Sequence, residues 1–431
     1  MSKVFKIIFL AGLICFCLPA FAQTNTISFT VNGLKVILKQ TEKETLVMNM
    51  YYKGGLTNYT AEKAGIESLA LSAIIECGNS KYSANEFDDE RDEFGLHLSS
   101  EATNDYSFVK LRCISLYAEE GWKLFSSAIT SPVFDLSKFE LLKQKQISEL
   151  NAGLSNPDER LKRLATSSAF DGSAYANSPD GTIESITALT HDAVKDYYYN
   201  TLLNKKRMFL VVAGNISKEE LENKIQSAFS GITEKDYTTA TVQQVNFKTD
   251  AYKIESRPLA TNYICGILNA PNLNSADYPA YRIGISLLNN ALFREIRLNK
   301  RLSYAPSAYI SKGKISYATM YASTTKPKET VKAMYETLSY VMNSLYTPET
   351  VERLQKNQLI SFTKRQEVMT NVADALGEAE VCGDWRLAEN FDERVSSVTP
   401  KEIKEVLQSY MQHISWAYMG DAALGEQSFT Q

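Results

Sequence analysis

The sequence predicts an α+β protein built from two similar lobes. The chain has 431 residues, 44% of them hydrophobic, which is more than a single hydrophobic core normally serves. Each half alternates segments that have the period-two pattern of half-buried strands with segments of helical periodicity. Two pairs of similar segments also recur about 210 residues apart. These observations favour an internal duplication, with one lobe in each half.

Three segments of the first half are expected to be strands: Thr45–Lys53, Tyr106–Ser115 and Arg207–Ala213. The second half repeats this order. Its expected strands are Asn262–Leu268, Leu302–Tyr309 and Trp416–Gly420, and its expected amphipathic helix is Glu329–Leu345.

Two pairs of helix-start segments carry the evidence for duplication. Leu189–Lys195 precedes the last strand of the first half and Val398–Lys404 that of the second, an offset of 398 − 189 = 209. Leu136–Phe139 and Thr347–Thr350 each open a helix, an offset of 347 − 136 = 211. The alternative is a coincidence of common helix-start patterns.

Residues 1–22 have the layout of a cleavable secretory signal peptide. Lys3 and Lys6 precede the apolar run Ile7–Leu18, and Ala20-Phe21-Ala22 supplies the small residues of a cleavage site. We therefore expect an exported protein, most simply a periplasmic one.

Two alternatives to a cleaved signal remain. A membrane anchor is disfavoured because the apolar run is shorter than the roughly 20 residues of a spanning helix, and we expect no membrane span elsewhere. A lipid anchor at Cys17 is weaker still, because the large side chain of Phe16 precedes it.

Charge and cysteine content exclude further classes. Without its signal the chain has 44 basic and 50 acidic residues, since Lys3 and Lys6 leave with it, so nucleic acid is not an expected partner. The remaining cysteines form no C-x-x-C pair and are expected to be small buried hydrophobes. They are Cys77, Cys113, Cys265 and Cys382.

The segment Gly54–Ser83 is the most specific in the chain: GGLTNYTAEKAGIESLALSAIIECGNSKYS. It resembles the first-domain signature of the pitrilysin/insulinase zinc peptidases, in the branch of mitochondrial processing peptidase. There a glycine-containing strand end leads through Ala-Gly-(Ile/Leu) into a helix with H-x-x-E-H, then Gly and a Lys-(Tyr/Arg)-Ser turn. Ala64-Gly65-Ile66 and Gly78–Ser83 match these flanks without a gap.

The resemblance covers nearly the whole mature chain at modest identity. Gly95–Ser107 is similar to the strand that lies beside bound peptide in active members, and Ser185–Asn215 ends the domain as the family does. It implies two homologous lobes, each a mixed, mostly antiparallel sheet packed with helices, which form a clamshell around a central chamber.

The resemblance places Ser68 and Ser72 at the two zinc histidines and Leu71 at the general-base glutamate. Two histidines four residues apart on a helix can bind one Zn²⁺ from the same side. A hydroxyl is a poor zinc ligand, and a leucine cannot take a proton from water. The chain is thus an inactive homologue that is expected to hold no cofactor itself, and zinc is expected in a partner.

No other metal site is evident from the sequence. The mature chain has three histidines, His97, His191 and His413, which are far apart and more typical of surface or capping residues than of ligands. A zinc site made from Glu, Asp and Cys is the remaining alternative.

The family's third zinc ligand is a glutamate about 80 residues downstream. Glu149 lies 149 − 68 = 81 residues beyond Ser68, and the Asn156-Pro157-Asp158 turn that follows also resembles the family. Glu149 is either a relic of that ligand or an ordinary surface charge on an amphipathic helix.

The second half retains a different part of the family's chemistry. The segment LFREIRLNKRLSY, Leu292–Tyr304, resembles one in which an arginine and a tyrosine seven residues apart reach a zinc site across the chamber, and here these are Arg297 and Tyr304. The tyrosine hydroxyl can donate to a carbonyl oxygen that gains negative charge, and the guanidinium can grip the peptide backbone. Without the resemblance, the arginine would be an ordinary helix-end residue and the tyrosine a core residue.

Three departures from the family pattern bear on this pair. The family's glycine-rich turn is shortened to Leu287–Ala291, and Arg301 replaces the usual glycine before Leu-x-Tyr. Pro306 interrupts the following strand, because it lacks the N–H that a central strand needs.

The expected organisation is a signal peptide (1–22), a peptidase-like domain with a degenerate zinc motif (23–232), a linker (233–248) and a second peptidase-like domain (249–431). The expected function is that of a non-catalytic subunit in a heterodimeric peptidase that acts on oligopeptides, with an H-x-x-E-H-bearing sister subunit; a homodimer is possible. The alternative is a peptide-binding or scaffold protein that uses strand addition. An independent hydrolase is disfavoured, because the sequence has no G-x-S-x-G motif.

Overall fold

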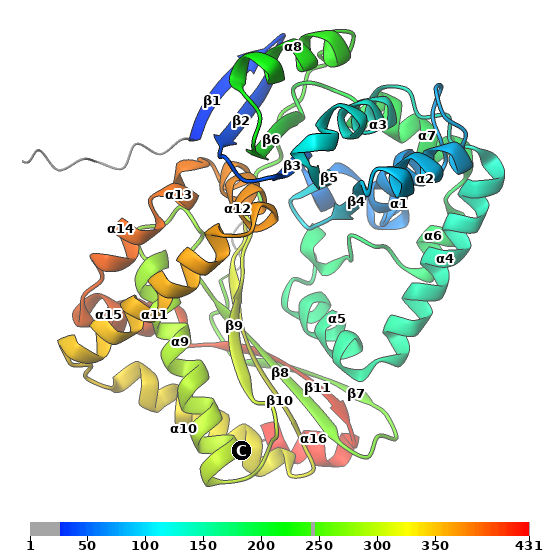
Figure 1. The fold of residues 1–431 in the computed structure, drawn as a ribbon. Coiled ribbons are helices and arrows are strands. Elements are labelled where there is room, and N and C mark those ends of the chain that lie inside the picture. Colours follow the sequence, from blue (N-terminus) through cyan, green and yellow to red (C-terminus); the bar gives the residue numbers. More distant parts are fainter. Residues whose placement is uncertain (1–25, 243–245, 431) are drawn as a thin grey trace, which may run out of the picture.

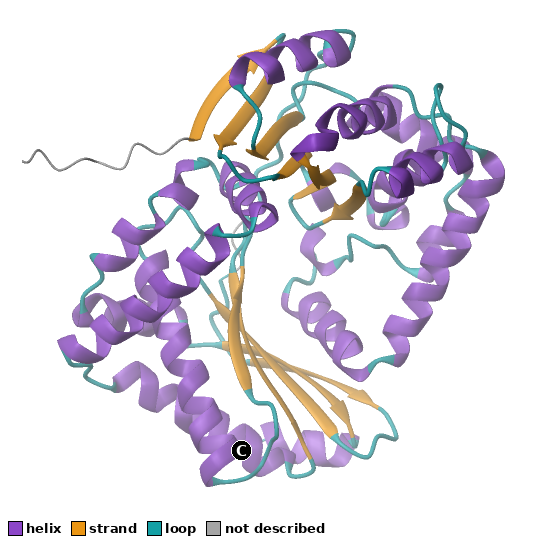
Figure 2. Ribbon diagram, viewed as in Figure 1, coloured by secondary structure: helices purple, strands orange, loops and turns teal. Residues whose placement is uncertain are grey.

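The computed structural model describes residues 26–242 and 246–430, and the expected signal peptide, residues 1–22, lies outside them. The chain folds into two α+β lobes, as predicted, each with one sheet and a set of helices (Figures 1 and 2). Among the described residues, no helix has both the length and the apolar character needed to cross a membrane.

The first sheet has the strand order β1-β2-β6-β3-β5-β4. Its strands are β1 (Thr26–Val31), β2 (Leu34–Gln40), β3 (Thr45–Lys53), β4 (His97–Ala102), β5 (Tyr106–Ile114) and β6 (Met208–Gly214). The helices of this lobe are α1 (Ile66–Glu76), α2 (Ala84–Glu93), α3 (Ala118–Thr130), α4 (Leu136–Ser155), α5 (Pro157–Ala169), α6 (Ile183–Ala188), α7 (His191–Tyr197) and α8 (Lys218–Phe229).

The second sheet has the order β7-β11-β8-β10-β9. Its strands are β7 (Ala251–Ser256), β8 (Asn262–Asn269), β9 (Ser307–Ser311), β10 (Tyr317–Thr324) and β11 (Ile414–Gly420). The helices are α9 (Tyr278–Leu292), the π-helical η6 (Phe293–Asn299), α10 (Pro327–Asn343), α11 (Pro348–Gln366), α12 (Met369–Val381), α13 (Arg386–Glu389), α14 (Phe391–Ser396), α15 (Pro400–Tyr410) and α16 (Ala422–Phe429).

The two sheets share one topology, which confirms the predicted homology of the lobes. In the first, β2 pairs in parallel with β6, and β6, β3, β5 and β4 follow as antiparallel neighbours. In the second, β7 pairs in parallel with β11, and β11, β8, β10 and β9 follow in the same way.

The helix starts that suggested duplication are equivalent caps. Thr190 caps α7 and Thr399 caps α15, each by accepting a backbone N–H with its side chain. Asp135 and Thr347 do the same for α4 and α11. These side chains satisfy N–H groups that the first turn of a helix leaves unpaired.

One predicted strand is wrong in extent. Leu302–Tyr309 was expected to be a strand, but β9 begins only at Ser307, directly after Pro306. The Leu302 N–H instead donates to the Ile296 carbonyl, 2.8 Å away, and closes the end of η6. The proline lacks an N–H for the ladder, so pairing starts after it.

The lobes exchange one helix each. Helix α5 of the first lobe places Leu161 and Ala165 against Ile267 and Ala417 of the second sheet. Its counterpart α12 places Val372, Ala373 and Leu376 against apolar side chains of the first sheet. Figure 1 shows both helices between the lobes. Because each lobe covers a sheet face of the other, the two lobes form one packed unit.

Charged pairs reinforce this exchange at both crossings. Asp374 of α12 accepts from Lys110 of β5 at 2.8 Å and from the Asn49 amide of β3 at 2.9 Å. Arg160 of α5 pairs with Glu255 of β7 at 2.7 Å.

The predicted linker region packs along the first lobe. Described residues between 233 and 250 form no helix or strand, but the Lys235 N–H donates to the Asn204 side chain at 2.9 Å. The Arg207 guanidinium lies 4.2 Å from the centre of the Tyr237 ring.

Three cysteines fit the predicted role. Cys77, Cys113 and Cys265 are unpaired and buried, whereas Cys382 is unpaired but only partly buried.

Candidate functional site

Helix α1 carries Ser68, Leu71 and Ser72, the positions predicted to correspond to the family's zinc motif. Gly65 caps its start with φ of +88°, and a Cβ there would lie 2.7 Å from the Asp180 carbonyl oxygen. Only glycine suits this backbone and this close approach. The Ala-Gly-Ile flank therefore fixes where α1 begins, and with it the direction of the following side chains.

The structure brings Ser68, Ser72 and Glu149 to one small pocket between α1 and α4, with a volume of about 230 Å³. The Ser72 hydroxyl lies 3.2 Å from the Ser100 hydroxyl of β4. Glu149 is exposed and, within the described residues, has no hydrogen bond or ion pair. Residues from two helices 81 positions apart thus share one cavity.

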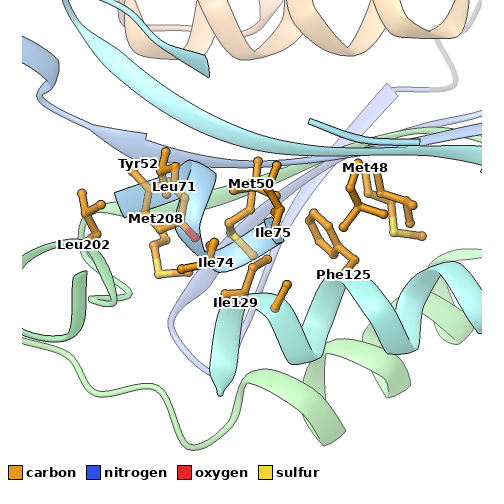
Figure 3. Close-up of a cluster of buried hydrophobic side chains, with 14 of the residues drawn as sticks. Met48, Met50, Tyr52, Leu71, Ile74, Ile75, Phe125, Ile129, Leu202 and Met208 are labelled. Carbon is orange, nitrogen blue, oxygen red and sulfur yellow. The ribbon is translucent and has the colours of Figure 1, made fainter. Parts of the chain in front are cut away.

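Leu71 does not line this pocket. Its side chain is fully buried in the core of the first lobe, among apolar residues of β3, α3 and β6 (Figure 3). Figure 3 shows it near Tyr52, Met50 and Met208. A carboxylate at this position would enter an apolar core unless the surrounding side chains repacked.

The donor atoms present do not fit a zinc ion. The pocket offers two serine hydroxyls and the carboxylates of Glu76, Glu149 and Asp180, but the described residues include no group of three or more His, Cys, Asp or Glu placed to hold a metal. The histidines serve elsewhere: His191 Nε2 lies 2.7 Å from the Phe134 carbonyl oxygen, His413 pairs with Asp250, and His97 is exposed on β4.

Seven lining residues of this pocket were not predicted from the sequence, five of them polar: Glu76, Lys145, Gln146, Arg163 and Asp180. Two of them had a usable signal, because Lys145 and Gln146 precede Glu149 by four and three residues and so share its face of α4. Arg163 comes from α5 and Asp180 from a loop, and no local pattern relates them to α1.

Opposing charges meet in the pocket. Burial raises the pKa of the Asp180 carboxyl above its ordinary value, the nearby Arg163 guanidinium opposes that shift, and Glu149 adds to it. Within the described residues, Arg163 forms no ion pair. The pocket therefore combines carboxylates with the guanidinium of Arg163.

A larger cavity of about 740 Å³ adjoins this pocket and lies between the lobes. The two share Leu150, Arg163 and Asp180 as lining residues. The end of β4 forms part of its wall, and β4 is an edge strand of the first sheet. An edge strand has unpaired N–H and C=O groups that can add an extended peptide.

Asp105 links the lobes beside this cavity. It accepts a hydrogen bond from the Tyr175 hydroxyl and, at 2.8 Å, from the Lys314 N–H of the second lobe. Burial raises the pKa of the Asp105 carboxyl, and these two hydrogen bonds oppose the rise. Gly313 permits the approach, because a Cβ there would lie 2.5 Å from Asp105 Oδ2.

Glu67, directly before Ser68, is a fully buried carboxylate. It accepts hydrogen bonds from the Ser107 hydroxyl at 2.6 Å, and from Asn58 and Tyr197 at 3.1 Å each. Burial raises the pKa of Glu67, and the three donors lower it in part. Glu67 therefore ties the start of α1 to β5 and α7.

Arg297 and Tyr304 lie together but apart from the α1 pocket. The guanidinium lies 4.1 Å from the centre of the Tyr304 ring and 4.9 Å from that of Phe293. Tyr304 is 79% exposed, and neither residue of the pair lines the pocket of Ser68 and Ser72. Within one chain the two sets of predicted site residues are not brought together.

The backbone before Tyr304 keeps the conformation that a glycine would favour. Arg301 has φ of +54°, the left-handed region that costs an L-residue about 1 kcal/mol or more. The replacement of glycine by Arg301 has therefore not removed the local turn.

Comparisons with known proteins agree with this description. Residues 188–358 match the family model "Peptidase M16 inactive domain". An uncharacterized zinc protease of Streptomyces coelicolor is 20% identical over 79% of this chain and 77% of its own length. Mitochondrial-processing peptidase subunit beta of Dictyostelium discoideum is 19% identical over 47% of this chain and 43% of its own length.

Solved structures share the fold. A peptidase M16 inactive domain from Pseudomonas fluorescens superposes with a TM-score of 0.83 at 15% identity, over 92% of this chain and 98% of that one. The periplasmic protease PqqL from Escherichia coli superposes with a TM-score of 0.77 at 14% identity, over 97% of this chain. The chain spans 49% of PqqL.

The α1 segment with its matching flanks, the duplicated topology, the family model and the relatives point to one conclusion. The chain resembles the pitrilysin/insulinase (peptidase M16) family over most of its length, and residues 188–358 match that family's inactive domain.

Proposed function

We propose that this chain is the non-catalytic subunit of an exported, two-chain zinc endopeptidase that acts on unfolded oligopeptides. The observation that carries the proposal is that this chain lacks the family's zinc-binding residues but retains its arginine and tyrosine. The zinc positions are Ser68, Leu71 and Ser72, whereas Arg297 and Tyr304 remain paired and exposed.

The exposure of the pair supports a role outside the chain's own pocket. A 79% exposed tyrosine next to a guanidinium is available to another molecule. In a sister subunit's zinc site, the Tyr304 hydroxyl would donate to the substrate carbonyl oxygen as it gains negative charge. The Arg297 guanidinium would hold the neighbouring backbone carbonyl. The sister would supply H-x-x-E-H and zinc.

The cavity between the lobes supports the substrate class. Its volume of about 740 Å³ holds a short extended segment and excludes a folded domain. The wall formed by β4 offers main-chain hydrogen bonds, which do not depend on the peptide's sequence. Unfolded peptides are therefore the fitting substrates.

Two relatives support a partner and an exported location. The relative in Dictyostelium is by name a subunit of a peptidase, and PqqL, about twice as long as this chain, is by its title a periplasmic protease. Residues 1–22 have the signal-peptide layout.

The test is reconstitution with a quenched, unstructured peptide and zinc. This chain, its H-x-x-E-H sister and their mixture are assayed separately at matched concentrations. Cleavage by the mixture well above the sum of the two separate chains is the expected result, and a mixture no more active than the sister alone would refute the subunit role.

A peptide-binding protein with no catalysis is the second candidate. The observation that favours it is the position of β4 at the edge of its sheet, beside a cavity that is lined partly by polar side chains. It predicts that the chain alone binds the peptide in fluorescence anisotropy and that no mixture cleaves it.

A further inference from the structure

The second lobe contains a pocket of about 400 Å³ between α9, β9 and α11. Its lining includes four carboxamides and two cations, and among the described residues it includes no Asp or Glu. The carboxamides are Asn289, Asn290, Asn357 and Gln358, and the cations are Arg282 and Lys312. A pocket with this lining offers N–H donors and positive charge, which suits an anionic ligand.

This pocket is the second-lobe counterpart of the pocket that holds Ser68 and Glu149. The residues that cap α4 and α11, Asp135 and Thr347, lie 347 − 135 = 212 residues apart. The second lobe has the hydroxyl of Ser361 at the position of the Glu149 carboxylate. At the same offset further lining residues of the two helices coincide: Leu142, Gln146 and Glu149 in the first lobe, and Leu354, Gln358 and Ser361 in the second.

Helices α1 and α9 extend this correspondence. Three side chains of α1 line its pocket, and three of α9 repeat their spacing of four residues at an offset of 282 − 68 = 214. They are Ser68, Ser72 and Glu76 on α1, and Arg282, Ser286 and Asn290 on α9. The offset is larger here because α9 has four residues before Arg282, whereas α1 has two before Ser68. The guanidinium of Arg282 therefore stands at the position of Ser68.

Arg282 is held in place with part of its hydrogen-bonding capacity unused. Its Nε donates to Gln358 Oε1 at 2.9 Å, and Gln358 Nε2 donates to the Ser286 hydroxyl at 2.8 Å. The guanidinium also lies 4.7 Å from the centre of the Phe391 ring. Within the part of the chain that the structure describes, the two terminal amino groups of Arg282 have no hydrogen bond, and the residue forms no ion pair.

The surroundings of Arg282 leave its charge uncompensated. Lys312, the other cation of the pocket, pairs with Glu378 at 2.6 Å, whereas Arg365 lies close enough to Arg282 for the two guanidiniums to repel each other. Burial lowers the pKa of Arg365, the Arg282 guanidinium lowers it further, and Tyr278 and Glu378 oppose this shift. Arg365 forms no ion pair among the described residues. A bound anion would relieve this repulsion.

We propose that this pocket binds a carboxylate, namely the one at the C-terminus of an unfolded peptide. The terminal amino groups of Arg282 would donate to its two oxygens, in the bidentate geometry that a guanidinium offers a carboxylate. Lys312 lines both this pocket and the cavity between the lobes, so the two spaces adjoin. A peptide held in the cavity can thus place its end in the pocket, and the inference rests on the proposed function for this substrate class.

The first experiment compares two labelled peptides in fluorescence anisotropy with the mature chain, residues 23–431. Both have the same short unstructured sequence without Asp or Glu and an N-terminal label; one ends in a free carboxylate and the other in an amide. We expect the free acid to bind about tenfold tighter or more, since hydrogen bonds to a charged group are the stronger ones. Equal affinities, or no binding of either peptide, would overturn the proposal.

Substitution assigns this preference to the pocket. Arg282→Gln removes the charge, and we expect it to abolish the preference for the acid while the affinity for the amide peptide stays unchanged, which also shows that the variant is folded. The control Arg353→Gln removes an exposed arginine of α11 that lines neither this pocket nor the cavity between the lobes, and it should keep the preference. An Arg282→Gln chain that keeps the preference would refute the assignment.

A competitor distinguishes the end of a peptide from a small free carboxylate. N-acetylglycine carries the same terminal group without the rest of the peptide, so it should displace the labelled acid only at concentrations far above those of unlabelled peptide. Equal potency of the two competitors would contradict a peptide as the source of the carboxylate. These assays contain no sister subunit and measure binding alone, so equal affinities of acid and amide would leave the peptidase-subunit proposal standing, which depends on cleavage by the reconstituted mixture.

Discussion

Three residues of α1, two of them at positions predicted to correspond to the zinc motif, serve packing and hydrogen bonding. Leu71 extends the apolar core, Ser72 contacts the Ser100 hydroxyl of β4, and Glu67 ties the helix start to three donors. The helix has thereby become part of the scaffold, and its remaining polar face lines a pocket without a metal-binding donor set.

The role of position 71 is tested by Leu71→Glu. The new carboxylate would be buried without a partner, so we expect the free energy of unfolding to fall by about 3 kcal/mol or more. Urea denaturation followed by circular dichroism measures it. The control Leu71→Met keeps the volume and should cost less than about 1.5 kcal/mol. Equal effects of the two variants on the free energy of unfolding would contradict the burial of the Leu71 side chain in the apolar core.

Glu67 makes a prediction about pH. Burial holds its folded-state pKa above the unfolded value, so the folded state binds more protons between these two values and loses stability as pH rises through that window. Replacement by the neutral, similarly shaped glutamine removes this contribution. We expect the stability of Glu67→Gln, relative to the unmodified chain, to improve from pH 4 to pH 8 in urea denaturation. A difference that does not change with pH would refute the assignment.

At the residue scale, the sequence predicts site residues that belong to one helix or to one family motif. The offset from Ser68 located Glu149, and both line one pocket. Arg163 and Asp180 were missed because they approach α1 from α5 and from a distant loop. Local periodicity reports on one helix face at a time, and such contacts depend on packing between elements.

At the scale of elements, the predicted strands of the first half agree with β3, β5 and β6 to within one residue at each end. The exchange of α5 and α12 could not be predicted. The apolar faces of these helices have the same pattern as any amphipathic helix. That pattern does not indicate which of the two sheets the helix packs against. Gly377 is a local sign of the crossing, because the Tyr51 ring lies over it.

Substitution of Gly377 tests the close packing of α12 against the first sheet. A Cβ at Gly377 would lie 2.1 Å from a ring atom of the fully buried Tyr51, so Gly377→Ala should lower the free energy of unfolding by about 1–3 kcal/mol. The control is Gly153→Ala in α4, where the new Cβ meets only the Arg163 guanidinium at 3.8 Å. There the better helix propensity should give a gain of about 0.5–1 kcal/mol. A gain at both sites would contradict the close packing of α12.

At the scale of the whole molecule, each lobe depends on a helix of the other lobe to cover one face of its sheet. Without α12, the first sheet would expose Ile37, Val47, Tyr51 and Phe209, all of which are fully buried in the intact chain. The lobes are therefore expected to unfold together.

Expression of residues 23–242 alone tests this dependence. The exposed sheet face should bind 8-anilinonaphthalene-1-sulfonate strongly and broaden or abolish the urea transition, because partly packed states bind this dye. The intact chain should unfold in one cooperative step without prior dye binding. An isolated half that unfolds cooperatively and binds no dye would show that the lobes are independent.

The central claim is that Arg297 and Tyr304 act in the zinc site of another chain. The most direct measurement is kcat/KM of the reconstituted mixture with Tyr304→Phe and with Arg297→Ala, beside Tyr340→Phe, which removes an exposed hydroxyl from α10. Loss of a donor to the developing oxyanion predicts a fall of about a hundredfold for Tyr304→Phe, a large fall for Arg297→Ala and no change for Tyr340→Phe. A mixture that is active yet indifferent to the first two substitutions would contradict the claim.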